Sequence, residues 1–325
     1  MDRRKALVLA GLAAAAGTSS LLAGCGGSDD PAILTPPASA PTPNIVELAK
    51  ATPSLSILVE AVVAADLAAT LSGAGPFTVF APNNDAFVAL LGELGVTKDA
   101  LLKDKVLLTT VLTYHVLGAK VEKAAIPVGK KITSLQKGIF KIDVPAGGVL
   151  SITDGRNRNS KILATDIQAS NGVVHVIDKV ILPANKNIVE TAVALAPQFS
   201  TLVAAVTAAN LGGTLSGPGP FTVFAPTNEA FAAALTELGI TQSALLGNVP
   251  LLTAILTYHV VSGTVLKAEI PVGAAIPTVQ GETLSIGADF KITDQRGRKS
   301  QIIITDVLTS NGVIHAVDKV ILPKA

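Results

Sequence analysis

The side chains that could do chemistry are few, and they occur in pairs. The chain holds four histidines, His115, His175, His259 and His315, and a single cysteine near its start. Zinc sites take three or four His, Cys or carboxylate ligands, often at short spacing such as His-x-x-x-His. Here the two histidines of each half lie far apart in sequence. This spacing favours imidazoles that hydrogen-bond within a mostly apolar core, and we predict no metal site.

Two aspartates are further candidates for chemistry. Asp166 or Asp178 could complete a metal site, although nothing in the spacing requires it. Asp178 lies three residues after His175, so on one strand their side chains face opposite sides and cannot pair directly. A carboxylate among the valines of its own face needs hydrogen-bond donors. We therefore expect Asp178 to accept hydrogen bonds that lock the last strand to its neighbour.

Motifs for catalysis are missing from the sequence. It contains no Gly-x-Ser-x-Gly elbow, no glycine-rich phosphate loop and no dinucleotide-binding fingerprint. We therefore predict that the protein is not an enzyme and needs no cofactor.

The histidines belong to a long internal repeat. Thr113 to Val116 (Thr-Tyr-His-Val) recurs as Thr257 to Val260, and Gly75 to Pro82 recurs letter for letter as Gly219 to Pro226. Solenoid repeats run roughly 20–50 residues, whereas this period is about 140 residues, the size of one complete domain. The sequence therefore predicts a tandem duplication.

The pattern within each copy changes from helices to strands. Asn44 and Asn187 can cap the first helix of each copy, and Thr97 to Leu112 predicts a later helix that runs into a strand over Thr113 to Leu117. Tyrosine and histidine on such a strand would pack their apolar bodies and hydrogen-bond through their polar tips. Five strands then follow, at about 132–136, 140–144, 149–153, 161–169 and 173–182. Helices followed by an antiparallel meander indicate an α+β fold.

Two local features carry specific backbone predictions. Asp66 and its counterpart Asn210 lie where the second helix of each copy should end, and Asp and Asn tolerate the left-handed conformation best among non-glycine residues. We expect φ > 0 at both. Asn171-Gly172 between two alternating runs predicts a β-hairpin with a type I′ turn, which needs positive φ at both positions.

These blocks resemble the hallmark motifs of the fasciclin domain family. Phe221 to Phe231, the Tyr-His pairs Tyr114-His115 and Tyr258-His259, and Asn-Gly-Val-x-His-x-Val-Asp-Lys-Val-Ile-Leu-Pro appear in the family's order in both copies. The resemblance implies two fasciclin-like domains, each a wedge-shaped β-sandwich with N-terminal helices packed on it. It also implies a surface location and a role in adhesion. In animal relatives the Tyr-His block is implicated in integrin binding, so Tyr114, His115, Tyr258 and His259 form a candidate binding block.

The start of the chain resembles a bacterial lipoprotein signal. A cationic stretch and an apolar run precede Leu22-Ala23-Gly24-Cys25, which resembles a lipobox and implies cleavage before an acylated Cys25. Arg3-Arg4 also resembles a twin-arginine signal, which leaves the export route open. Gly26 is not the aspartate that retains lipoproteins in the inner membrane, so we expect a lipoprotein of the outer membrane or cell surface, within the cell envelope.

We therefore expect a signal peptide at 1–24, a Pro-rich tether at 25–43 and domains at 44–183 and 187–325. The tether's prolines and small polar residues are typical of a semi-rigid spacer. The linker at 184–186 is so short that the domains should lie nearly in contact through a small interface.

The charge balance limits the classes of partner that the chain could bind. Lys and Arg number 25 against 24 Asp and Glu, without a basic patch, which argues against nucleic acid. The sequence predicts a lipid-anchored binding or adhesion module for an extracellular protein or polysaccharide. The alternative is a carrier of a small apolar, pigment-like ligand.

Overall fold

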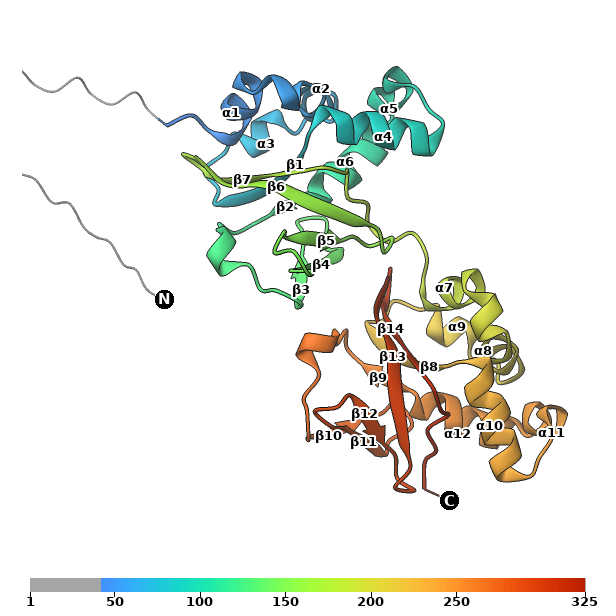
Figure 1. The fold of residues 1–325 in the computed structure, drawn as a ribbon. Helices are drawn as coiled ribbons and strands as arrows, with labels where there is room; N and C mark the ends of the chain where they lie inside the picture. The colour runs from blue at the N-terminus through green and yellow to red at the C-terminus, as the bar shows by residue number, and fades with distance from the viewer. Residues whose placement is uncertain (1–41, 325) are drawn as a thin grey trace, which may run out of the picture. The chain divides into compact units, whose positions relative to one another are not determined.

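The computed structural model describes residues 42–324. The predicted signal peptide, Cys25 and nearly all of the tether lie outside the described residues. Residues 42–324 lie within one compact unit. This unit contains the same arrangement of helices and strands twice, called domain 1 and domain 2 below (Figure 1). In the described part of the chain, no helix is long and apolar enough to cross a membrane.

Domain 1 begins with helices and ends with strands. Its helices are α1 (Ile45–Ala51), η1 (Pro53–Leu55), α2 (Ser56–Ala64), α3 (Ala68–Leu71), α4 (Asn84–Leu94), α5 (Lys98–Lys103), α6 (Lys105–Tyr114) and η2 (Lys123–Ala125). Its strands are β1 (Phe77–Pro82), β2 (Val116–Leu117), β3 (Lys131–Thr133), β4 (Ile139–Asp143), β5 (Ser151–Thr153), β6 (Asn159–Ala169) and β7 (Gly172–Ile177).

Domain 2 repeats this order, except that one helix with a kink at Phe199, α8, takes the place of η1 and α2. Its helices are α7 (Ile188–Ala194), α8 (Ala196–Ala208), α9 (Gly212–Leu215), α10 (Asn228–Leu238), α11 (Gln242–Gly247), α12 (Val249–Tyr258) and η3 (Lys267–Glu269). Its strands are β8 (Phe221–Pro226), β9 (Val260–Ser262), β10 (Ala275–Pro277), β11 (Thr283–Ile286), β12 (Lys291–Thr293), β13 (Lys299–Thr309) and β14 (Gly312–Val317).

The first helix of each domain starts as the sequence predicts. The Asn44 side chain accepts a hydrogen bond from the Glu47 backbone, and the Glu47 carboxylate accepts one from the Asn44 backbone. Asn187 and Glu190 form the same capping box in domain 2. Each box satisfies two N–H groups that a helix start otherwise leaves without partners.

The predicted helix stop is confirmed in both domains. Helix α2 ends at Ala64, and Asp66 has φ 57°; its counterpart Asn210 has φ 54°. A left-handed residue ends the helical hydrogen-bond pattern, and aspartate and asparagine accept this conformation at low cost.

The predicted helix over Thr97–Leu112 is two helices, and the strand after it begins later than predicted. Asp104 separates α5 from α6, and its carboxylate caps α6 by accepting from the Leu107 backbone. Helix α6 then continues through Tyr114, and strand β2 starts only at Val116. The Tyr-His pair therefore lies at a helix end and not on a strand, because the apolar spacing of α6 keeps Leu108, Val111 and Leu112 on its buried face.

The sheet of each domain has seven strands, and in domain 1 their order is β2-β1-β7-β6-β5-β4-β3. Strands β3 to β7 form the predicted antiparallel meander. The central pair β1–β7 is parallel, in register from Phe77 opposite Gly172 to Pro82 opposite Ile177. The α+β fold class is confirmed.

The sheet folds over at β6. Residues 159–161 of this strand pair with β5, and the pairing with β7 begins at Ile162 and has two register shifts. Bulges of this kind bend a strand. One core lies between the two halves of the folded sheet and contains Phe80, Tyr114, Phe140, Ile142 and Ile152. A second core lies between the sheet and the helices, which cover one face of it in Figure 1.

The Asn-Gly hairpin is present, but the type I′ turn was wrong. Ala169 pairs with Gly172, and neither Asn171 nor Gly172 has positive φ. Tertiary contacts decide this turn. The Asn171 side chain accepts from the Ile45 backbone and donates to the carbonyl oxygens of Leu71 and Gly73. A Cβ atom on Gly172 would overlap the backbone of Phe77, so glycine is needed here for the close approach of β1.

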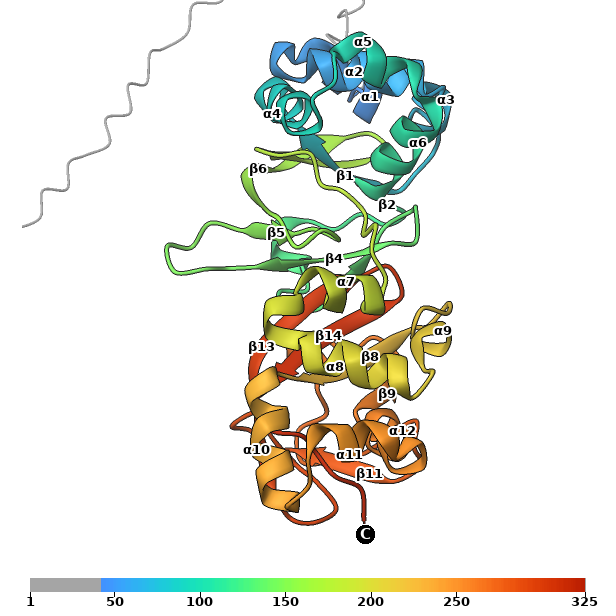
Figure 2. The same ribbon diagram turned by 90° about the vertical axis from the view of Figure 1, so that its right-hand side faces the viewer.

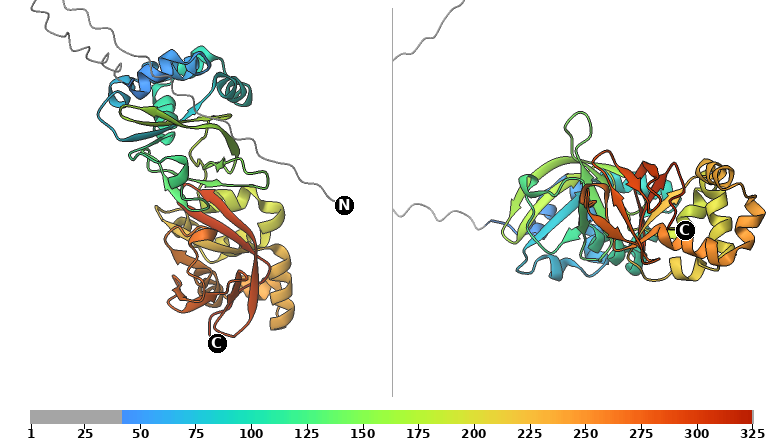
Figure 3. Two further views of the ribbon diagram at one scale, coloured as in Figure 1. Left: turned by 60° about the vertical axis from the view of Figure 1, so that its left-hand side comes forward. Right: turned by 90° about the horizontal axis from the view of Figure 1, so that it is seen from below.

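The two domains touch, as the short linker suggests. The Asn157 amide donates to the Leu308 carbonyl (3.0 Å) and accepts from the Leu308 N–H (2.7 Å). Lys141 forms an ion pair of 2.8 Å with Asp306. Figures 2 and 3 show β4 and β5 beside the end of the β13–β14 hairpin.

Candidate functional site

The Tyr-His block lies inside each domain. Tyr114 and Tyr258 are 0% exposed, and His115 and His259 are 2% and 1% exposed. A partner at the surface cannot reach these side chains in this structure. Any contribution of the block to binding has to come through the segments that it positions, and that contribution stays a prediction.

The Tyr114 hydroxyl joins strand β4 to the turn between β5 and β6. It donates to the Ile139 carbonyl (2.6 Å) and accepts from the Gly155 N–H (2.8 Å). The ring packs edge-on against Phe140, with centroids 5.7 Å apart. Burial, together with the nearby Asp154 carboxylate, raises the pKa of Tyr114 far above its usual value. Both hydrogen-bonding functions of the hydroxyl are thus used for structure.

His115 is held as a neutral imidazole. Its Nδ1 lies 2.7 Å from the Val111 carbonyl, and its Nε2 accepts from the Ile181 N–H at 3.0 Å. This geometry requires the proton on Nδ1 and leaves Nε2 as the acceptor. Burial lowers the pKa of His115 to about 4, because the charged form is desolvated and Nε2 faces a donor.

His175 uses the opposite tautomer. Its Nε2 lies 2.9 Å from the Val121 carbonyl, and its Nδ1 accepts from the Asp166 N–H at 3.3 Å. The same contacts recur for His259 and His315 in domain 2. The prediction of buried, hydrogen-bonded histidines is therefore confirmed. Within residues 42–324 no group of three or more His, Cys, Asp or Glu side chains could hold a metal ion.

Asp178 accepts hydrogen bonds as predicted, but the last strand ends at Ile177 and not at Leu182, so Asp178 lies just beyond it. It follows β7 and accepts from the Lys161 N–H (2.7 Å) and the Ser160 hydroxyl (3.1 Å) of β6. Asp318 repeats both contacts in domain 2. The carboxylate thus ties the segment after the last strand to its neighbour.

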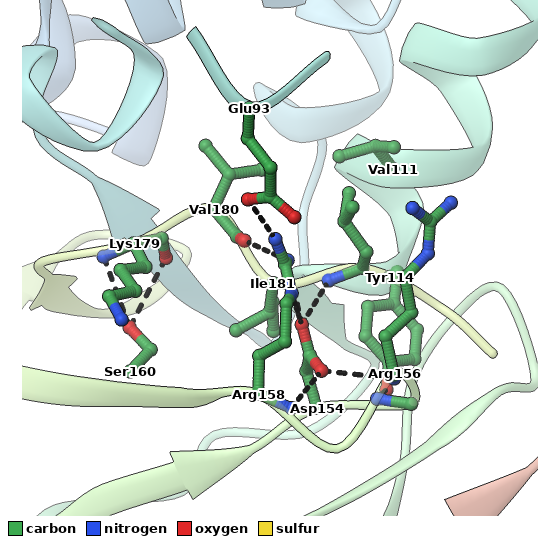
Figure 4. Close-up of polar contacts among 12 residues, drawn as sticks. Glu93, Val111, Tyr114, Asp154, Arg156, Arg158, Ser160, Lys179, Val180 and Ile181 are labelled. Carbon is green, nitrogen blue, oxygen red and sulfur yellow. Dashed lines mark hydrogen bonds and ion pairs between the residues drawn. The ribbon is translucent and has the colours of Figure 1, made fainter. Parts of the chain in front are cut away.

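A buried ion pair that the sequence analysis missed lies beside the Tyr-His block (Figure 4). Asp154 is 1% exposed and accepts five hydrogen bonds. They come from the backbone N–H groups of Arg156, Arg158 and Leu182, and from Nε and one terminal nitrogen of the Arg158 guanidinium.

The Arg158 side chain extends this network outward. It also donates to the Val180 carbonyl (2.8 Å) and to Glu93 of α4 (2.7 Å). The pair therefore connects the β5–β6 turn to the segment after β7 and to a helix. Asp294, Arg298, Glu237 and Val320 repeat it in domain 2. The recurrence of Thr-Asp-x-Arg-x-Arg at 153–158 and 293–298 is the sequence signal that could have found it.

An apolar cavity lies next to each of the helix-end histidines. The cavity in domain 1 has a volume of about 30 Å³ and is lined by residues such as Val46, Leu58, Val62 and His115. The equivalent cavity beside His259 also has a volume of about 30 Å³. Each space is close to the share of one water molecule in the liquid, about 30 Å³.

The two halves of this duplicated α+β fold match a known domain family. Residues 53–183 and 197–323 both match the fasciclin domain. The chain therefore belongs to the fasciclin family.

Similar proteins come from animals and bacteria. Transforming growth factor-beta-induced protein ig-h3 of Sus scrofa is 33% identical over 255 residues, which cover 78% of this chain and 35% of that protein. Protein sll1483 of Synechocystis is 50% identical over 128 residues, covering 38% of this chain and 67% of that protein. The chain thus spans only about a third of ig-h3.

A solved FAS1 domain pair from the insect cell adhesion molecule Fasciclin I is also similar. It has 16% sequence identity and a TM-score of 0.42, and the match covers 83% of this chain and 97% of that one.

Proposed function

We propose that this fasciclin protein is a lipid-anchored, non-enzymatic binding or adhesion module of the cell envelope that recognises an extracellular protein or polysaccharide. Membership of the fasciclin family supports this role. The main supporting observation is that the repeated polar side chains are occupied by contacts inside the fold. The Tyr114 hydroxyl, both nitrogens of His115 and the Asp154 carboxylate all make hydrogen bonds within the domain. The duplicated polar residues therefore stabilise the fold, and we assign recognition to residues at the surface.

A binding experiment tests this function. We expect the purified chain to bind saturably to a polysaccharide on a glycan array or to a protein in an extracellular-matrix extract. The same chain unfolded in denaturant is the control and should lose this binding. Turnover of an offered substrate without saturable binding to any glycan or matrix protein would count against the proposal.

The carrier alternative gains little support from the cavities. Ligand pockets usually measure roughly 300–1,000 Å³, and the apolar cavities measure about 30 Å³ each. Protein side chains do not absorb visible light, so a visible absorbance band in the purified protein would favour the carrier.

The anchor is proposed on the lipobox-like Leu22 to Cys25. Several acyl chains on Cys25 would hold the protein stably on a membrane. We expect Cys25→Ser to move the protein from the membrane fraction to the soluble fraction and to remove the lipid mass. Ser28→Ala, in the same segment, should leave both unchanged. A Cys25→Ser protein that stays in the membrane fraction would contradict the anchor.

A further inference from the structure

A polar groove lies at the joint between the two domains. Its volume is about 520 Å³, within the roughly 300–1,000 Å³ of ligand sites. Domain 1 lines it with Lys131, Thr133, Gln136 and Lys137, and domain 2 with Thr264 and Ser310 among others. The lining of this joint groove includes two ammonium groups and no carboxylate.

The two lysines of the joint groove are available for a ligand. Both are exposed. The Lys131 Nζ donates to the Thr264 carbonyl at 3.1 Å, which uses one of its three N–H donors. In the described residues, the lysines that form ion pairs are others: Lys98, Lys105, Lys120, Lys141 and Lys291.

The equivalent turn of domain 2 lacks both charges. Ala275 stands in place of Lys131, and Gly281 in place of Lys137. The turns are built alike, because Lys137 N–H donates to the Ser134 carbonyl as Gly281 N–H does to that of Thr278. Lys137 has φ 72°, a conformation that suits glycine and costs a lysine free energy. A lysine kept at a strained position, only in the turn that faces the joint, points to a function there.

The joint itself is built from residues peculiar to each copy. Asn157 and Lys141 of domain 1 contact Leu308 and Asp306, whereas the equivalent positions in domain 2 hold Gly297 and Ser285.

The apolar side of the joint shows the same difference. Leu266, Leu308 and Val313 cluster in domain 2, with Ile139 of domain 1 packed on them. The positions equivalent to Leu266 and Leu308 on the face of domain 1 are Glu122 and Gln168. Both copies are thus specialised for this one contact, which holds the walls of the joint groove together.

We propose that the joint groove binds an acidic polysaccharide, with Lys131 and Lys137 contacting uronate carboxylates. This inference rests on the proposed binding function and names its ligand class. Ammonium–carboxylate hydrogen bonds are among the stronger polar contacts, and the hydroxyl and amide groups of Thr133, Gln136 and Ser310 match sugar hydroxyls.

The test replaces both lysines with the residues that domain 2 has at these positions. Lys131→Ala/Lys137→Gly should fold normally, because glycine relieves the strain at φ 72°. Calorimetric titration of the full-length chain with oligogalacturonate at low salt is expected to show saturable binding. The double variant should bind at least about tenfold more weakly, because two charge-assisted contacts are lost.

Two controls distinguish specific binding in the joint groove from nonspecific electrostatic attraction. Lys50→Ala/Lys103→Ala removes two exposed lysines at helix ends and should leave the affinity unchanged. A neutral oligosaccharide of equal length should not bind. The proposal is overturned if oligogalacturonate does not bind, if both double variants lose affinity equally, or if polyglutamate binds more tightly than oligogalacturonate. A different result would contradict the proposed binding function as a whole: no glycan on the array and no matrix protein would bind.

Discussion

Replacing Asp154 by alanine is expected to lower the free energy of unfolding of domain 1 by about 3–5 kcal/mol. The carboxylate is 1% exposed, and its loss leaves the half-buried Arg158 without its main partner. It also leaves the backbone N–H of Leu182 without an acceptor. A partly buried guanidinium that keeps only Glu93 and the Val180 carbonyl, and a buried donor without an acceptor, are both destabilising.

Denaturant unfolding measures this effect, and Glu93→Ala is the matched control. Glu93 pairs with the same guanidinium but is half exposed, so its removal should cost less than about 1 kcal/mol. Asp294→Ala should reproduce the large effect in domain 2. A loss below about 1 kcal/mol for Asp154→Ala would show that the network does not stabilise the fold.

Acidification from pH 7 to pH 5 is expected to destabilise the protein by about 2 kcal/mol for each of His115 and His259. Burial lowers the pKa of both to about 4 from the usual 6.5. Between these values the unfolded chain binds a proton that the native imidazole does not. Stability is therefore fully present above about pH 6.5 and is lost as pH falls towards 4. Burial shifts the pKa of His315 in the same direction.

Unfolding free energies of the wild type and His115→Gln, compared at pH 7 and pH 5, test this dependence. Glutamine cannot take up a proton, so the variant should lose about 2 kcal/mol less than the wild type over this range, whatever its stability at pH 7. Carboxylates of ordinary pKa stay mostly ionised above pH 5 and contribute little. An identical pH dependence for the two proteins would mean that His115 is not held neutral.

The Tyr-His block shows which structural features local sequence patterns can predict. Its repetition and its buried, hydrogen-bonded character could be predicted, because both follow from residue type and position. Its place at the end of α6 could not, since a short apolar run is compatible with a helix or a strand. The hydrogen bond between Asp154 and Leu182 could not be predicted either, because it depends on where two segments that are distant in sequence meet in the fold.

The sequence by itself determined the duplication, the α+β class, the capped first helices and the left-handed stops at Asp66 and Asn210, because these depend on nearest neighbours and on periodicity. Only the tertiary structure decided the turn at Asn171, where contacts to Ile45 and Leu71 outweigh the local preference for a type I′ turn. The tertiary structure also determined which residues meet at the joint between the domains. Lys141 and Asp306 become partners through the docking of two folded surfaces, and no local pattern in either copy encodes that contact.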